Sequence, residues 1–281
     1  MLCKSCMAGS YVNGVCDHCG RRQTVQEQDR SALRPDTVLH QRYRMGDILG
    51  RGGFGITYAA WDMQRNCRVA IKELFPSNDV LRSADHLTVQ VMEGKEKIFA
   101  QATENFTKEA RQLMNMQDIP GVVRIFHLFT NNNTVYYAME FLDGMDLNAF
   151  LKQNGPMSWQ QLEPIVRFLL ETLDQLHRRG VIHRDVSPDN VFLLRDGGVR
   201  LIDFGSVRTF QGADHFTVFV KKNFAPWEQY QSNGQQGPWT DIYSLCVTIY
   251  FSLSGKLPPI ASQRRIDDQA VPLYVYCPSL P

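Results

Sequence analysis

His183-Arg184-Asp185-Val186-Ser187-Pro188-Asp189-Asn190 is the stretch that decides the fold, and Asp203-Phe204-Gly205 begins 13 positions after its last residue. The first segment follows an apolar pattern with helical spacing over residues 158–179, which predicts a helix that Gly180 stops. The second lies directly behind Val199–Ile202, a segment that predicts a strand. Both segments are therefore expected on loops beside regular elements.

Two further motifs precede them in the chain. Gly50-Arg51-Gly52-Gly53-Phe54-Gly55 matches the pattern GxGxxG, but a dinucleotide-binding fingerprint opens a helix, whereas residues 56–61 here continue as a strand. Glycines let a hairpin close over phosphates with backbone N–H groups facing them, although a plain glycine-rich hairpin has the same sequence. Val69-Ala70-Ile71-Lys72 on the next predicted strand makes a phosphate site the better interpretation.

The four motifs, in this order, resemble the signature of the eukaryotic-like Ser/Thr protein kinase family over roughly residues 43–260. The phrases VAIKELFP, HRDVSPDN and PWEQY look like the bacterial branch of that family. The resemblance implies an α+β, bilobal fold with a β-rich N-lobe and an α-helical C-lobe. The predicted elements are strands at 43–50, 55–62, 67–73, 122–130 and 134–141, and helices at 98–116, 158–179 and 241–254.

The resemblance assigns the nucleotide contacts. Lys72 would hold the α/β-phosphates of ATP and pair with a carboxylate on the first long helix. Glu109 is the predicted partner and Glu104 the alternative, because the 37 positions between Lys72 and Glu109 indicate an insertion. The other implied ATP contacts are loop glycines, a hinge with a gatekeeper, and two residues around the adenine: Gly50, Gly52, Gly53, Gly55, Met139, Glu140, Leu142, Ala70 and Phe192. The apolar members of this set also look like ordinary core residues.

The resemblance also assigns the chemistry. Asp185 would orient the substrate hydroxyl and accept its proton. Asp203 and Asn190 would bind Mg²⁺, which prefers hard oxygen ligands. Asp241 resembles the buried aspartate that anchors the catalytic loop, with a simple helix N-cap as the alternative.

One exchange departs from the family pattern. Typical members carry Lys at the position of Ser187 and Thr at the position of Lys221, seven residues before Glu228 of the Pro-Trp-Glu element. The hydroxyl and the ammonium have therefore changed places. We expect Lys221, or its neighbour Lys222, to supply the cation that Ser187 lacks, and two solvated lysines in a mobile loop are the alternative.

The segment from Asp203 to Glu228 corresponds to the activation loop of the family. Its candidate phosphoacceptors are Ser206, Thr209 and Thr217, of which Thr217 is favoured by its central position. Arg184 would pair with a phosphate there. Autophosphorylation is therefore expected.

The first 22 residues carry a separate pattern. Cys3 and Cys6 form one CxxC pair and Cys16 and Cys19 a second, which is the spacing of four ligands in a structural zinc site. So short a segment cannot bury enough apolar surface to fold alone, so Zn²⁺ would supply its folding free energy. Reduced, unliganded thiols are the alternative. Thiols of either kind indicate a reducing, cytoplasmic compartment.

The amino-acid composition excludes several other classes of protein. With 43% hydrophobic and 21% charged residues, the chain is typical of a globular protein. A net charge of +1 favours neither nucleic acid nor an anionic membrane surface. No apolar run reaches the roughly 18–20 residues that span a bilayer, and the N-terminus has no secretory core.

These observations predict a zinc ribbon at 1–22, a linker at 23–40 and a protein kinase domain at 41–281, divided into an N-lobe at about 41–142 and a C-lobe at about 143–281. The C-lobe is expected to be short, since family members have further helices after Leu257-Pro258-Pro259.

The expected function is transfer of the ATP γ-phosphate to Ser/Thr residues of protein substrates, with a regulatory partner for the ribbon. A nucleotide-binding pseudokinase scaffold and a small-molecule phosphotransferase are the alternatives.

Overall fold

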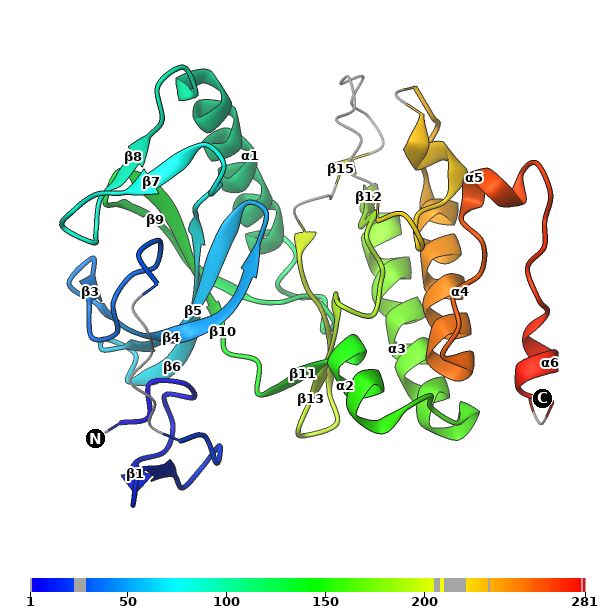
Figure 1. Ribbon diagram of the computed structural model, residues 1–281, viewed down its shortest axis with the longest axis horizontal. Coiled ribbons are helices and arrows are strands. Elements are labelled where there is room, and N and C mark those ends of the chain that lie inside the picture. The colour runs from blue at the N-terminus through cyan, green and yellow to red at the C-terminus, as the bar shows by residue number, and fades with distance from the viewer. Residues whose placement is uncertain are drawn as a thin grey trace. The chain divides into compact units, whose positions relative to one another are not determined.

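Alternating apolar residues build a six-stranded antiparallel sheet (Figure 1). β4 (Tyr43–Gly52), β5 (Gly55–Asp62) and β6 (Cys67–Leu74) form a meander, as the sequence predicts. β10 (Thr134–Glu140) and β9 (Ile125–Asn131) continue the sheet beyond β6, and the short β3 (Val38–Leu39) lies at the other edge. The strand predicted from residue 122 begins only at Ile125, because Val122 forms an isolated parallel bridge with Leu201 instead.

This computed structural model describes residues 2–22, 29–204, 208–209, 221–231, 233–278 and 280, with backbone only at 208–209. The chain divides into two units. The N-terminal unit comprises Met1–Gln117 and Arg124–Asp143, and the C-terminal unit comprises Asp118–Val123 and Gly144–Pro281.

The sheet of the N-terminal unit is covered on both faces. Successive side chains of a strand point to opposite faces, so neighbours in sequence enter different surroundings. On one face, Ile71 and Tyr136 pack with residues of the hairpin β7 (Val80–Arg82) and β8 (Val89–Val91). The helix α1 (Glu96–Met114) contacts strands β6, β9 and β10.

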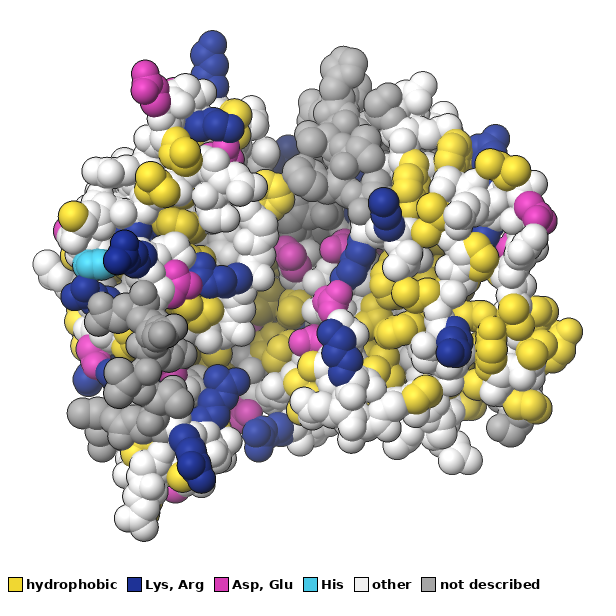
Figure 2. Space-filling view, viewed as in Figure 1, with side chains coloured by type: hydrophobic (Ala, Val, Ile, Leu, Met, Phe, Trp, Pro, Cys, Tyr) yellow, Lys and Arg dark blue, Asp and Glu magenta, His cyan; other side chains and the backbone are white. Residues whose placement is uncertain are grey.

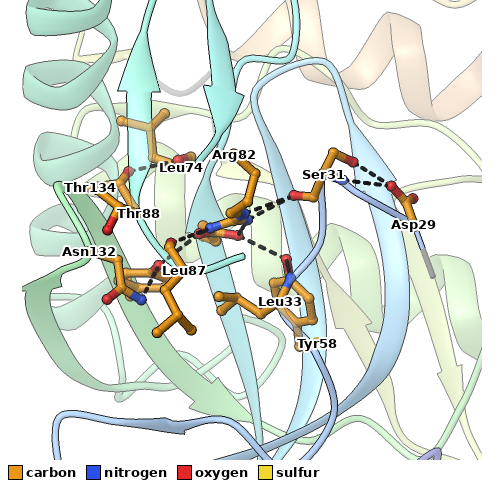
Figure 3. A network of polar contacts seen from close by, with 12 residues as sticks. Asp29, Ser31, Leu33, Tyr58, Leu74, Arg82, Leu87, Thr88, Asn132 and Thr134 are labelled. Carbon is orange, nitrogen blue, oxygen red and sulfur yellow. Dashed lines mark hydrogen bonds and ion pairs between the residues drawn. The ribbon is translucent and has the colours of Figure 1, made fainter. Parts of the chain in front are cut away.

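A buried ionic network fastens the hairpin to the sheet (Figure 3). The guanidinium of Arg82 donates to both carboxylate oxygens of Glu73, at 2.8 and 2.7 Å, and to the carbonyl of Ser31. The hydroxyls of Tyr58 and Tyr136 donate to the same carboxylate at 2.8 and 2.7 Å. Because every oxygen of this fully buried acid has donors, its charge is compensated.

Part of the segment at 23–40, which was expected to be a linker, packs against the sheet. Ala32 and Leu33 are buried in the sheet's core, and the backbone N–H of Leu33 donates to the Tyr58 hydroxyl (Figure 3). β3 then pairs with β4. Residues 29–40 therefore belong to the N-terminal unit, which corrects the linker interpretation for them, while residues 23–28 lie outside the described part of the chain.

The cysteine-rich segment packs on β4. It contains the short strands β1 (Tyr11–Val12) and β2 (Val15–Cys16). The N–H of Asp47 donates to the Lys4 carbonyl at 2.8 Å, and the Ser5 hydroxyl donates to the Asp47 carboxylate. A Cβ at Gly46 would lie 2.2 Å from the same Lys4 carbonyl, so glycine is what permits this approach.

The C-terminal unit is mainly helical. Ser158 and Gln161 form a capping box at the start of α3 (Trp159–Arg178), and Gly180 and Gly255 follow the ends of α3 and α4 (Pro238–Ser254) with positive φ. The helices predicted at 158–179 and 241–254 are confirmed. The other helical elements are α2 (Leu147–Asn154), η2 (Trp227–Tyr230), α5 (Ala261–Arg264) and α6 (Leu273–Tyr276).

Short strands complete this unit. β11 (Gly144–Asp146), β13 (Val191–Leu194) and β14 (Val199–Leu201) form one sheet, and β12 (Val181–Ile182) pairs with β15 (Arg208–Thr209). Hydrophobic side chains gather around α6, where Tyr274 is 68% exposed (Figure 2). In the part of the chain that the structure describes, no helix combines the length and the apolar character needed to cross a membrane.

Candidate active site

Lys72 lies on β6 and forms an ion pair with α1. Its Nζ lies 3.2 Å from Oε1 of Glu109, and the Tyr137 hydroxyl donates to the same oxygen at 3.1 Å. Glu109 is only 9% exposed, whereas Glu104 is exposed and contacts Gln101. Of the two acids considered from the sequence, Glu109 is thus the one that contacts the lysine. The insertion expected between Lys72 and Glu109 is the hairpin β7–β8.

The glycine-rich segment forms the turn between β4 and β5, where Gly52 pairs with Gly55. A Cβ at Gly55 would lie 2.2 Å from the carbonyl oxygen of Glu73, so a side chain is excluded there. At Gly50, Gly52 and Gly53 a Cβ would meet no atom within 4 Å. Open space beside these backbone groups is what a phosphate ligand requires.

The expected hinge lies at the end of β10. Met139 pairs in register with Ala70 of β6, just after a bulge, and Glu140 accepts from the backbone N–H of Arg124 at 3.0 Å. Leu142 follows the strand and is half-buried. The remaining predicted adenine contact, Phe192, lies on β13 in the C-terminal unit.

Asp241 holds the catalytic loop. Its fully buried carboxylate accepts from the backbone N–H groups of His183 and Arg184, at 2.9 and 2.7 Å. His177 Nε2 contacts the same group at 2.8 Å. The anchoring interpretation is confirmed and the N-cap interpretation is wrong, since Gly237 occupies that position of α4.

The loop places Asp185 among polar groups. The amide nitrogen of Asn190 donates to the Asp185 carbonyl at 2.9 Å. Burial raises the pKa of Asp185 above its ordinary value; the Lys221 ammonium and His183 oppose that shift, while Asp203 adds to it. Burial lowers the pKa of His183 despite three nearby carboxylates.

Asp203 follows β14 and is exposed, with a positive φ of 61°. The next residue, Phe204, is buried and its ring meets that of His183 edge-on at 4.6 Å between centroids. This contact joins the two segments that carry Asp185 and Asp203. The structure therefore brings these two acids into one electrostatic environment.

Lys221 also reaches this loop. Its ammonium donates to the Ser187 hydroxyl at 2.8 Å and pairs with Asp189. Asp189 was not predicted as a functional residue, although its place beside Asn190 could have indicated one. Ser206, Thr217 and the Thr209 side chain lie outside the described part of the chain.

Gln229 was also missed. Its side chain is 3% exposed, and its amide nitrogen donates to the Arg184 carbonyl at 2.8 Å. This bond ties η2 to the catalytic loop. In the sequence, the only sign of a role for Gln229 is its position in the PWEQY phrase.

The four cysteines of the two CxxC pairs converge. Their Sγ atoms all lie within 4.8 Å of one another, with 3.8 Å between Cys3 and Cys19 and 3.7 Å between Cys6 and Cys16. Zn–S bonds of about 2.3 Å in a tetrahedron place sulfurs about 3.8 Å apart. The donor set and its spacing therefore fit a structural zinc ion. His18 lies outside this cluster, near Asp143.

The chain is similar in sequence to known proteins. The chain is 32% identical over 235 residues to the serine/threonine-protein kinase PknA of Nostoc sp., covering 79% of this chain and 39% of that protein. It is 30% identical over 251 residues to the serine/threonine-protein kinase F of Synechocystis sp., covering 83% and 48%. The chain thus spans less than half the length of these curated relatives.

A solved structure, the PpkA-294 apo form, is 30% identical in sequence and has a TM-score of 0.76. The likeness covers 89% of this chain and 88% of that one. Residues 43–272 match the family described as protein kinase domain. The chain belongs to the protein kinase domain family.

Proposed function

We propose that this chain is an ATP-dependent kinase that phosphorylates Ser and Thr hydroxyls of protein substrates. Family membership and the relatives described as serine/threonine-protein kinases support this activity. The observation that carries the proposal is the catalytic loop, in which Asp241 fixes the backbone immediately before Asp185. Phosphoryl transfer depends mainly on positioned groups, and this loop is positioned by buried hydrogen bonds.

Asp185 would act as the general base. The substrate oxygen forms a bond to the γ-phosphorus, the bond from that phosphorus to the oxygen of the departing ADP breaks, and Asp185 takes the hydroxyl proton. Its raised pKa brings its basicity nearer to working pH than that of an ordinary aspartate.

Oxygen groups beside Asp185 fit magnesium. The amide orientation of Asn190 is set by its hydrogen bond to the Asp185 carbonyl, so its oxygen is the atom that would ligate. Asp203 offers an exposed carboxylate. When bound, Mg²⁺ would neutralise charge on the phosphates.

The N-terminal unit would bind ATP. Lys72, held by Glu109 and so kept in one orientation, would contact the α/β-phosphates. The backbone of the glycine-rich turn, with open space at three of its glycines, would cover the phosphates. The adenine contacts stay as proposed from the sequence: Ala70, Met139, Glu140, Leu142 and Phe192.

The cysteine-rich segment would bind structural Zn²⁺ through Cys3, Cys6, Cys16 and Cys19. Because its four ligands are all sulfur atoms of the chain, the ion would have no open position for catalysis. We assign residues 1–22 as the ribbon. The ribbon would bind a regulatory partner, and a cytoplasmic location is proposed because its cysteines form no disulfide.

The test is transfer of the γ-phosphate from ATP to a generic protein substrate and to the chain itself, with Mg²⁺ present. We expect the wild-type protein to form phosphoserine or phosphothreonine. Asp203→Ala should lose at least about 10²-fold in rate, since a magnesium ligand is removed. Binding of ATP, seen as a thermal shift, without any transfer would instead favour a scaffold.

A matched pair of variants tests the nucleotide site. Glu109→Gln should lower kcat/KM for ATP by about 10-fold or more, because Lys72 loses its charged partner. Glu104→Gln changes the same residue type on the same helix but at an exposed position, and should stay within about twofold of wild type. Equal effects of the two variants would contradict the assignment of Glu109.

A further inference from the structure

The ammonium of Lys221 lies beside the loop that carries the proposed general base. Its Nζ donates to Ser187 Oγ over 2.8 Å and also pairs with Asp189. Ser187 Oγ lies 3.4 Å from Asp185 Oδ1, and Ser187 is fully buried. A single hydroxyl therefore separates the cation from the carboxylate of Asp185.

The backbone of Lys221 is fixed as well. Its carbonyl accepts from the N–H groups of Phe224 and Ala225, at 2.9 and 3.1 Å. Both of these residues are buried, and the Phe224 ring lies 5.7 Å from the lysine Nζ. The backbone and the ammonium of Lys221 are thus both bonded, and 33% of its side chain is exposed. Its neighbour Lys222, in contrast, is exposed.

The reaction requires a cation at this place. Negative charge spreads over the oxygens of the phosphoryl group during transfer, and a fixed positive group stabilises it. The catalytic loop offers the carboxylates of Asp185 and Asp189 and the neutral hydroxyl of Ser187. Lys221 brings positive charge to these groups through its contacts with Ser187 and Asp189.

We propose that Lys221 is a catalytic residue that contacts the γ-phosphate during transfer, an inference that rests on the kinase activity proposed above. The lysine keeps its proton throughout and donates a hydrogen bond to an oxygen of the transferring group. Ser187 and Asp189 hold the ammonium in place. The positive charge thus comes from the segment around residue 221 rather than from the catalytic loop itself.

The experiment measures kcat and KM for ATP with Mg²⁺ and a generic protein substrate. Lys221→Met keeps the length of the side chain and removes its charge, so kcat should fall by about 10²- to 10³-fold. The KM for ATP should change by less than about threefold, because the contact strengthens in the transition state. The matched control Lys222→Met should leave both parameters within about twofold.

An exchange variant distinguishes the loss of the positive charge of Lys221 from a simple loss of structure. Ser187→Lys combined with Lys221→Thr returns the cation to the loop, and should recover at least about tenfold in kcat over Lys221→Met. Lys221→Arg, which keeps the charge, should also exceed Lys221→Met. If Lys221→Met does not fold, Lys221→Thr alone serves as the uncharged reference for both charged variants.

The outcomes separate this inference from the proposed function. Wild-type transfer together with a Lys221→Met kcat within about threefold of wild type would overturn the role of Lys221 and leave the kinase activity standing. The role of Lys221 would equally be overturned if neither charged variant exceeds the uncharged one in kcat. A wild-type protein that binds ATP but transfers no phosphate would overturn both the role of Lys221 and the kinase activity.

Discussion

At the scale of residues, neighbouring side chains of a β-strand point to opposite faces of the sheet and so have different roles. Lys72 and Glu73 are adjacent on β6, and they pair in register with Tyr137 and Tyr136 of β10. Lys72 and Tyr137 contact Glu109, while Glu73 accepts hydrogen bonds from Tyr136 and Arg82. One residue step therefore separates a proposed phosphate ligand from a buried structural ion pair.

Asp62 provides a pH-dependent part of the stability. Its buried carboxylate accepts two hydrogen bonds from Arg42, at 2.9 and 2.6 Å, and two from the backbone N–H groups of Gln64 and Arg65. Burial raises the pKa of this carboxyl, but the bonds from Arg42 and the backbone outweigh burial and leave it lowered. The folded protein therefore favours the ionised form.

We predict that Asp62→Asn lowers the free energy of unfolding at pH 7 by on the order of 2 kcal/mol. Because the folded-state pKa lies below the unfolded value of about 3.9, the contribution of the carboxylate is complete above about pH 5. It is lost as the pH falls through the folded-state pKa. Urea unfolding at several pH values should show the difference between wild type and variant shrinking below about pH 4.

The control is Asp174→Asn, which removes an exposed partner of Arg178. It should change the unfolding free energy by less than about 0.5 kcal/mol at any of these pH values. A difference for Asp62→Asn that stays constant down to pH 3 would contradict the ionic explanation.

Residues whose role depends on a motif can be identified from the sequence, whereas residues whose partner lies far along the chain cannot. The motif Val69-Ala70-Ile71-Lys72 identifies Lys72. The spacing leaves its partner undecided between Glu109 and Glu104, because an insertion changes that spacing. Ser187 likewise shows from the sequence alone that the loop lacks the lysine that is typical of the family. The position of Lys221 beside it required the folded chain, since 34 residues separate the two.

At the scale of elements, long periodic segments can be predicted from the sequence, whereas most short ones cannot. The patterns of β4, β5, β6, α3 and α4 repeat often enough to be read from the sequence. The hairpin β7–β8 has strands of three residues each, too short for a periodic signal. The segment at 29–40 looks polar, and only Ala32, Leu33 and Leu39 enter the core.

We predict that the hairpin is held mainly by Arg82. Arg82→Met should lower the stability of the N-terminal unit by about 3–5 kcal/mol, because Glu73 would stay buried without its cation. Adding Glu73→Gln should recover part of this loss, since the uncompensated charge is then removed. Thermal unfolding of the three proteins gives the comparison.

Arg44→Met is the matched control, because Arg44 pairs with Asp36 at the surface of the same unit, with both side chains more than 40% exposed. It should cost less than about 1 kcal/mol. Equal losses for Arg82→Met and Arg44→Met would show that the buried network contributes no more than a surface pair.

At the scale of the whole molecule, the order of the motifs was enough to predict a strand-rich unit followed by a helix-rich one. What the motifs could not predict is the attachment of the N-terminal segment. The cysteine-rich ribbon and residues 29–40 both pack on the N-terminal sheet, through contacts such as those of Asp47 and Leu33. These contacts join segments that lack any recurring pattern.

Metal removal should therefore affect one unit and spare the other. We predict that chelation of the zinc-loaded protein, without ATP, speeds backbone amide exchange by about tenfold or more at Asp47, whose N–H donates to Lys4 between the first two cysteines. The amides of His183 and Arg184, which donate to Asp241 in the C-terminal unit, should keep their protection because the four proposed zinc ligands belong to the N-terminal unit. Hydrogen exchange followed by mass spectrometry measures both regions in one experiment. Cys16→Ser should reproduce the effect of chelation, while Cys246→Ser, at an exposed cysteine outside the cluster, should not. Unchanged exchange at Asp47 after verified zinc loss would show that the ribbon folds and packs on β4 without its metal.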